Sequence, residues 1–101
     1  MENVTGEVVE QLLNGDQVVL VDYFAKWCGP CKSLMPRLSE LQSEYPNTKF
    51  VSVDVDENID HAMKMGIRSV PTVMIYKGGE LVDRSSGANS DTFYKNILNN
   101  L

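Results

Sequence analysis

The sequence predicts a single α/β domain, residues 1–101, in which helices cover both faces of a small central mixed β-sheet. Apolar, β-branched runs alternate along the chain with segments that have helical apolar spacing. A Gly-Gly pair separates two strand-like runs near the end, as in a β-hairpin. The 101 residues, 43% of them apolar, contain no repeat or linker-like tract and suffice for one hydrophobic core.

The first quarter of the chain is expected to form a helix and then a buried strand. Val4 to Leu13 has helical apolar spacing, with Thr5 as the N-cap and Asn14-Gly15 as the stop signal. The next run, residues 18–25 ("VVLVDYFA"), is almost continuously apolar. Such a run is typical of a strand that is buried on both faces.

A second helix is expected to open near Cys28, because residues spaced three or four apart are apolar from there on. Its buried face should consist of Leu34, Leu38, Leu41 and Tyr45. Lys49 to Val55 is the second expected strand, with its three valines on one side. A short helix should follow around Ile59 and Met63, one turn apart, with Gly66 as its cap.

The last third of the chain predicts a hairpin and a helix. The expected strands, residues 72–77 and 80–86, are joined by Gly78-Gly79, which can adopt the positive φ angles of a tight turn. The final helix should begin near Ser90. Its buried face is expected to be Phe93, Ile97 and Leu101. The helical connections imply parallel strands and the hairpin adds antiparallel ones, so the sheet is expected to be mixed.

The charge and the N-terminus argue against several function classes. A net charge of −5 disfavours binding to nucleic acid or to an anionic membrane surface. The longest strictly apolar run, Val18 to Val21, is far too short to cross a bilayer. The first ten residues have no basic start and no apolar signal core. We therefore expect a cytoplasmic protein without nucleic-acid or membrane partners.

Both cysteines, Cys28 and Cys31, lie within the run "AKWCGPCKSLMP". A disulfide that closes a loop of about four residues stabilises a fold by only about 2 kcal/mol, against about 4.7 kcal/mol for a loop of 100. A closed zinc site needs four ligands, and the only histidine, His61, is expected on another helix. Zinc shared between two chains remains an alternative, but a close pair in a cytosolic chain favours redox chemistry.

The position of Cys28 at the start of a helix favours its thiolate. Pro30 suits the first helical turn, where its missing N–H would be unpaired in any case. The free N–H groups and aligned peptide dipoles of that turn stabilise an anion. An ordinary thiol, with a pKa of about 8.5, is only about 3% ionised at pH 7. We therefore predict that Cys28 attacks a substrate disulfide and that the more shielded Cys31 resolves the mixed disulfide.

Asp22 interrupts the apolar run "VVLVDYF" at a position that is expected to be buried. An isolated buried carboxylate is costly, so such a group takes up a proton and its pKa rises. A carboxyl group with a raised pKa beside a thiol can act as a general acid or base. Taken alone, Asp22 could be a hydrogen-bonded structural residue; beside the cysteine pair, we predict that it accepts the Cys31 proton.

Three stretches, "VDYFAKWCGPCKSLMP", "GIRSVPT" and "SSGA", closely resemble the thioredoxin family. The Trp-Cys-Gly-Pro-Cys-Lys run is highly specific, and the expected order of elements fits essentially the whole chain. The resemblance implies the thioredoxin fold and reduction of protein disulfides by a monomer that needs no cofactor or metal beyond its redox-active disulfide. It also implies thioredoxin reductase or an equivalent dithiol donor as the electron source, and clients such as ribonucleotide reductase.

The resemblance also implies roles for single residues. Cys28 is similar to the family's nucleophile, Cys31 to its resolving thiol and Asp22 to its buried carboxylate. Pro71 resembles the family's cis-proline opposite the active site, although an ordinary trans-proline is the alternative on sequence alone. Val70 would pair its backbone with an extended substrate. The residues similar to the family's substrate-contact surface are Trp27, Gly29, Pro30, Gly66, Ile67, Val70, Gly87 and Ala88.

Three departures from the family pattern affect these implications. Phe24 stands where many bacterial members have a second tryptophan. Ser52 stands where many of them have a lysine near the buried aspartate, so the tuning of Asp22 is open. The segment before the first helix is short, and the family's first strand is therefore expected to be very short or missing.

Other residue types have simpler interpretations. His61 is expected to be a solvated helix residue, and Trp27 a partly exposed aromatic at a protruding helix start. The methionines Met35, Met63, Met65 and Met74 are expected to fill the core. An acidic cluster lacks the spacing and central glycine of a calcium loop, so we interpret it as a strand end and helix-capping residues. Its members are Asp54, Asp56, Glu57 and Asp60.

Two other functions remain as alternatives to a reductant. Some thioredoxins are structural subunits of a larger enzyme and use the same apolar surface without redox chemistry. An oxidant or isomerase is disfavoured, because Gly-Pro between the cysteines resembles the reducing members.

Overall fold

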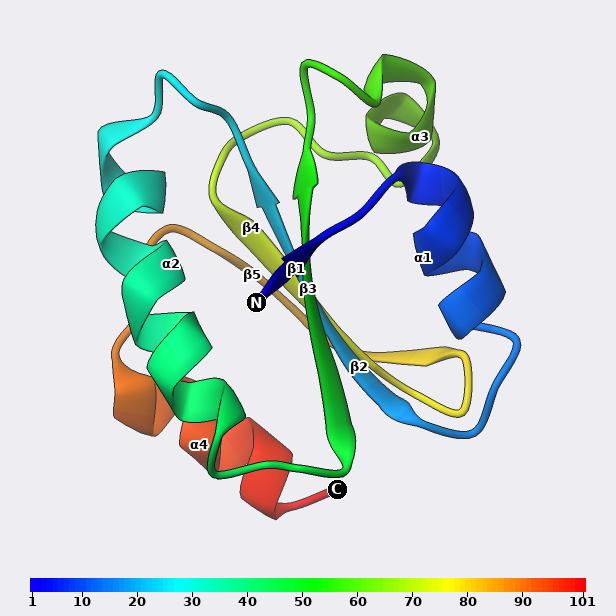
Figure 1. The fold of residues 1–101 in the computed structure, drawn as a ribbon, viewed down its shortest axis with the longest axis vertical. Coiled ribbons are helices and arrows are strands. Elements are labelled where there is room, and N and C mark those ends of the chain that lie inside the picture. Colours follow the sequence, from blue (N-terminus) through cyan, green and yellow to red (C-terminus); the bar gives the residue numbers. More distant parts are fainter.

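The computed structural model describes all residues, 1–101, and shows a five-stranded sheet between two pairs of helices (Figure 1). In chain order the elements are β1 (Glu2–Asn3), α1 (Gly6–Leu12), β2 (Val18–Phe24), α2 (Gly29–Gln42), β3 (Thr48–Asp54), α3 (Ile59–Lys64), β4 (Thr72–Lys77), β5 (Glu80–Ser86) and α4 (Asp91–Asn99). The strands lie in the order β1-β3-β2-β4-β5. The predicted α/β class with a mixed sheet is therefore confirmed.

The strand directions depart from the prediction at one connection. β2 and β3 run parallel, with Phe24 opposite Asp54, as expected for a strand-helix-strand unit. β4, however, is antiparallel to β2, with Tyr23 opposite Thr72. Asp54, at the end of β3, and Thr72, at the start of β4, both pair with the last residues of β2, so the connection through α3 stays at one end of the sheet. β4 therefore starts where β3 ends and runs the other way.

The helices form two layers, one on each face of the sheet. In Figure 1, α2 and α4 lie on one side and α1 and α3 on the other. The core under α2 and α4 consists of Leu20, Leu34, Leu38, Leu41, Phe50, Val73, Ile75, Tyr94 and Leu98. The core on the α1 and α3 side consists of Val9, Val19, Val21, Tyr23, Val51, Val53, Met74 and Tyr76. β2 supplies alternate residues to both cores, which explains its nearly unbroken apolar sequence.

The N-terminal segment forms a very short strand of two residues, and Thr5 is the N-cap of the first helix, both as the sequence predicts. Thr5 has extended backbone angles, and its Oγ1 accepts a hydrogen bond from Val8 N at 3.3 Å. This is an N-cap, so the helix starts at Gly6. The hairpin prediction is confirmed, because Gly78 and Gly79 have φ angles of 59° and 81°.

The last helix, α4, presents a different face to the core from the one predicted. Tyr94 and Leu98 are buried, whereas the three expected residues, Phe93, Ile97 and Leu101, are half-buried at the edge. Tyr94 fixes this rotation of the helix. Its hydroxyl accepts a hydrogen bond from Asn89 N at 3.3 Å, which a polar tip inside a core requires. None of the four helices is both long and apolar enough to cross a membrane.

Candidate active site

The two cysteines lie at the start of α2, as the sequence predicts. They form a disulfide whose Cα atoms are 5.3 Å apart. Cys28 is the N-cap residue of α2, and Pro30 lies in the first turn. The N–H of Cys31 donates to Cys28 Sγ over 3.2 Å. A sulfur at this position faces the unpaired N–H groups and the positive end of the helix dipole.

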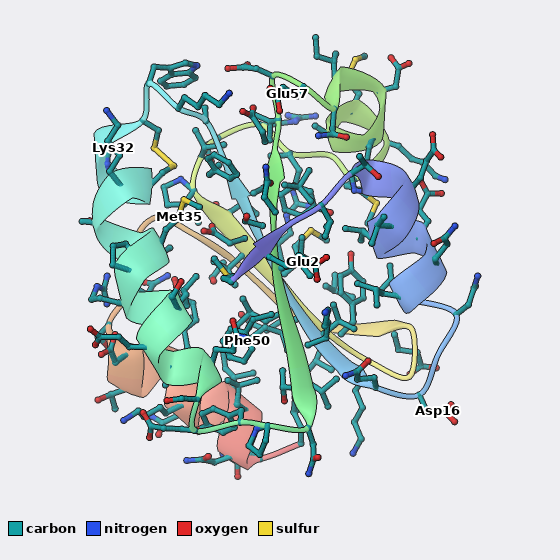
Figure 2. The ribbon with its side chains drawn as sticks, in the orientation of Figure 1. Glu2, Asp16, Lys32, Met35, Phe50 and Glu57 are labelled. Carbon is teal, nitrogen blue, oxygen red and sulfur yellow. A yellow bond between two sulfur atoms is a disulfide. The ribbon has the colours of Figure 1, made fainter.

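A small apolar cluster surrounds the disulfide. Phe24 and Ala25, at the end of β2, are buried with both cysteines. Half-buried Met35, Val55 and Val70 pack against this cluster. Figure 2 shows the disulfide at the first turn of α2, beside the labelled Lys32.

Asp22 lies two residues before Phe24 on β2, and both side chains point to the α2 side of the sheet. The Asp22 carboxyl group is fully buried, and neither of its oxygens has a hydrogen-bond partner. This burial raises the pKa of Asp22 to about 7. Ser52 is the neighbouring residue on β3, and its hydroxyl donates to Asn3 Oδ1 at 3.3 Å and not to Asp22. The Asp22 carboxyl group therefore changes between its protonated and its charged form near neutral pH.

The loop before β4 lies against Cys28. The Val70–Pro71 peptide bond is cis, and the carbonyl oxygen of Val70 is 3.6 Å from Cys28 Sγ. Gly87 N donates to Pro71 O at 2.8 Å, which joins the end of β5 to the same loop. The structure thus brings Val70, Pro71 and Gly87 together next to the disulfide.

The other residues of the predicted contact surface differ in how far they are exposed. Trp27, Gly29, Pro30, Gly66 and Ala88 are exposed. Ile67 is half-buried and packs against the core on the α1 and α3 side.

Arg84 on β5 ties down the end of α3 next to this surface. It donates to the carbonyl oxygens of Met65, at 2.8 Å, and Gly66.

One contact of Trp27 was missed by the sequence reasoning. Its indole Nε1 donates to Asp56 Oδ2 at 2.9 Å, and the neighbouring Lys26 is 3.3 Å from Glu57. The contact follows from the parallel pairing of β2 and β3, which aligns Phe24 with Asp54 and brings the following residues together, and the sequence carries no direct signal of that register. Asp54 does act as a strand-end cap, accepting from Asp56 N at 2.9 Å.

The expectation that His61 is solvated is wrong. Its ring is buried and stacks on Tyr23, with the ring centroids 5.7 Å apart. Burial raises the pKa of the Tyr23 hydroxyl, so it stays neutral, and its oxygen lies 2.9 Å from His61 Nε2, within hydrogen-bond distance. His61 Nδ1 faces Glu10 at 3.5 Å. The His61 ring can occupy this buried position because Gly6 has no side chain. A Cβ atom at Gly6 would overlap the imidazole.

The methionines also differ from the prediction in one case. Met74 is buried, and Met35 and Met65 are half-buried against the core, as expected. Met63 is exposed, because α3 is short and only its other side, with Ala62, faces the sheet. A hollow of about 390 Å³ beside α1 and α3 includes His61 but none of the residues around the disulfide.

The comparisons with known proteins agree with this geometry. A family model described as Thioredoxin matches residues 2–99. Thioredoxin-2 of Saccharomyces cerevisiae is 42% identical over 90 residues, 89% of this chain and 86% of that protein. Thioredoxin 2 of Chlorobaculum tepidum is 47% identical over 79 residues, 77% of this chain and 72% of that protein.

The chain belongs to the thioredoxin family.

Solved thioredoxin structures also show the same fold as this chain. The X-ray structure of Fasciola hepatica thioredoxin superposes with a TM-score of 0.88 at 37% identity and covers 98% of each chain. The Plasmodium falciparum thioredoxin structure superposes with a TM-score of 0.89 at 34% identity and covers 100% of each chain. With its Cys28–Cys31 pair, this thioredoxin-family protein is a thiol–disulfide oxidoreductase that acts through a redox-active disulfide.

Proposed function

We propose that Cys28 is the nucleophile, that Cys31 resolves the mixed disulfide, and that Asp22 accepts the Cys31 proton. The observation that best supports the first role is the Cys31 N–H, which points at Cys28 Sγ from the first turn of α2. In the reduced protein, this donor and the helix dipole stabilise a thiolate on Cys28. Cys31 lies inside the helix and is buried, so its thiol needs a base.

The reaction runs in two exchange steps. The Cys28 thiolate attacks one sulfur of a client disulfide, a mixed disulfide forms, and the other client sulfur leaves as a thiolate. The Cys31 thiol then loses its proton to the Asp22 carboxylate, and the resulting thiolate attacks Cys28 Sγ. The second client sulfur leaves and takes up a proton, so two electrons have passed to the client. The short spacing makes the second step intramolecular and fast.

Client docking is proposed to use the loop around Pro71. The Val70 backbone lies beside Cys28 Sγ, and an extended client segment could pair with it as an added strand. The remaining members of this docking rim are Trp27, Gly29, Pro30, Gly66, Ile67, Gly87 and Ala88. The rim has exposed backbone and few charges, which suits clients with different sequences.

The partners follow from the family and not from this chain alone. Electrons would come from thioredoxin reductase or an equivalent dithiol donor and pass to clients such as ribonucleotide reductase. We place the protein in the cytoplasm, as a monomeric single domain without nucleic-acid or membrane partners.

A reduction assay with insulin tests the proposal. The reduced protein should reduce insulin faster than free dithiothreitol does at equal thiol concentration. Equal rates would refute the proposed function. The reduction potential separates a reductant from an oxidant, since reference values are about −270 mV for thioredoxin and about −120 mV for a strong oxidant.

A further inference from the structure

Three of the five large apolar side chains that the protein exposes lie at the end of the sheet that holds the disulfide. Trp27 is 72% exposed, Ile59 60% and Met63 73%. Single exposed apolar side chains are common, but Ile59 and Met63 lie one turn apart on α3, and Trp27 is hydrogen-bonded to Asp56 in the segment that leads into this helix. The other two, Leu81 (50%) and Val82 (44%), are on β5 near the hairpin turn, at the opposite end of the sheet.

The contacts of Trp27 connect it to α3. The indole donates to Asp56, which is only three residues before Ile59. Three peptide units span at most about 11 Å between Cα atoms. Met63 is four residues further along α3, one helical turn from Ile59 and on the same side of the helix. Trp27, Ile59 and Met63, with Asp56 between the first two, therefore lie along one side of the molecule, here called the α3 surface.

The core does not need the two α3 side chains. The sheet-facing side of this helix consists of Ala62 and His61, both buried. Ile59 is the first helical residue, where a polar residue would serve as well. Two large apolar side chains on a six-residue exposed helix are therefore available to contact another molecule.

The charges beside the α3 surface are acidic. Asp56, Glu57 and Asp60 lie in the same segment, and Lys64 is bound to Glu10 at 2.7 Å. Glu57 is paired with Lys26, but Asp60 has no ion-pair partner. A partner that covers this surface would therefore gain from carrying lysine or arginine close to its apolar side chains.

We propose that the α3 surface is a second contact region for client proteins, adjoining the rim around Cys28. It binds the client segment next to the reacting disulfide, and it prefers segments that combine apolar residues with lysine or arginine. The surface is on the order of 15–20 Å long, which corresponds to about five or six extended residues. This inference rests on the proposed function, because only a client that brings its disulfide to Cys28 reaches this surface.

A double variant, Ile59→Ser with Met63→Ser, tests the apolar part. We expect kcat/KM for insulin to fall about tenfold, because truncating an interface residue that contributes to binding costs more than about 1 kcal/mol. The rate with bis(2-hydroxyethyl) disulfide, which is too small to reach α3, should not change. The matched control, Leu81→Ser with Val82→Ser, removes two exposed apolar side chains far from Cys28 and should leave both rates unchanged. Circular dichroism would verify that each variant is folded.

The results separate this inference from the proposed function. If the wild-type protein reduces neither substrate, the proposed function fails. If the wild type is active but the α3 variant reduces insulin at the wild-type rate, the inference is overturned. It is also overturned if both substrates or both double variants are affected equally, or if the substitution only dissociates a dimer of the protein.

A charge-matched pair tests the acidic part. Asp60→Asn should lower kcat/KM about threefold for a disulfide peptide flanked by lysines, and not for one flanked by glutamates, since charges at an interface rim act mainly on association rates. Asp16→Asn changes the net charge by the same amount. In Figure 2 Asp16 lies at the far end of the molecule from Glu57, the neighbour of α3. Equal effects of the two substitutions would contradict the preference for basic clients.

Discussion

The backbone N–H of Cys31 donates to Cys28 Sγ over 3.2 Å, from the first turn of the helix that Cys28 caps. In the reduced protein this N–H would donate to the free sulfur, and the positive end of the helix dipole would lie next to the same sulfur. Both favour the charged form of Cys28, while Cys31 is inside the helix and lacks such a donor. The two thiols should therefore differ in reactivity.

Replacing each cysteine by serine should have different consequences. Cys28→Ser removes the nucleophile, so insulin reduction should stop. Cys31→Ser leaves the nucleophile but removes the group that releases the client, so mixed disulfides should accumulate and be visible on non-reducing gels. If instead Cys28→Ser accumulates mixed disulfides, the assignment of roles is reversed.

Asp22 should make the stability of the oxidised protein depend on pH. Its pKa rises from 3.8 to about 7 on folding, so the folded state binds the proton more tightly than the unfolded state. The associated stability is fully present below pH 4 and is lost as the pH rises through 7, on the order of 4 kcal/mol in total. The Asp22→Asn variant should not show this decrease in the free energy of unfolding as the pH rises. Urea unfolding of both proteins at pH 4 and pH 8 measures it, and parallel pH profiles would contradict the buried, unpaired carboxyl group.

The same substitution should slow the second exchange step. An asparagine cannot accept the Cys31 proton, so decay of a preformed mixed disulfide at pH 7 should slow on the order of a hundredfold, as for loss of a general base. Stopped-flow measurement with a fluorescent client disulfide gives this rate. An unchanged rate would leave Asp22 a structural residue.

The Tyr23–His61 pair and Gly6 should form one packing unit. Gly6→Ala places a methyl group in the imidazole ring and should destabilise the protein by about 2 kcal/mol or more. His61→Ala should also destabilise it by about 2 kcal/mol, because the buried Tyr23 hydroxyl loses its partner. The double variant should be less unstable than the sum of the two. Strict additivity in urea unfolding would show that the two positions do not interact.

The sequence predicted those parts of the fold that depend on local pattern. The hairpin follows from Gly78-Gly79, and β2 from its unbroken apolar run, because both signals are local. The direction of β4 was predicted wrongly, since it depends on where the whole connection after β3, loops included, returns the chain to the sheet. The buried face of α4 differs from the predicted one because the Tyr94 hydroxyl has a hydrogen-bond partner, Asn89 N, in the preceding loop. The spacing of apolar residues carries no information about such a partner.

The residues of the candidate site likewise divide into those that the sequence predicts and those that depend on the tertiary structure. Cys28, Cys31 and Asp22 stand out in the sequence, because each is an unusual residue for its position. The burial of His61 could not be predicted, since it depends on Gly6, which is distant in the sequence and provides the space. The Asp56 partner of Trp27 depends on the register between β2 and β3. The exposure of Met63 depends on which side of a short helix the sheet covers.

Titration of the two thiols in the reduced protein, followed by thiolate ultraviolet absorbance in wild type and in the two single serine variants, tests the central claim most directly. The account predicts that Cys28 ionises with a pKa clearly below the ordinary value of about 8.5, and that Cys31 ionises above it. If both thiols ionise only at or above about 8.5, the start of α2 does not stabilise a thiolate, and the proposed mechanism is contradicted.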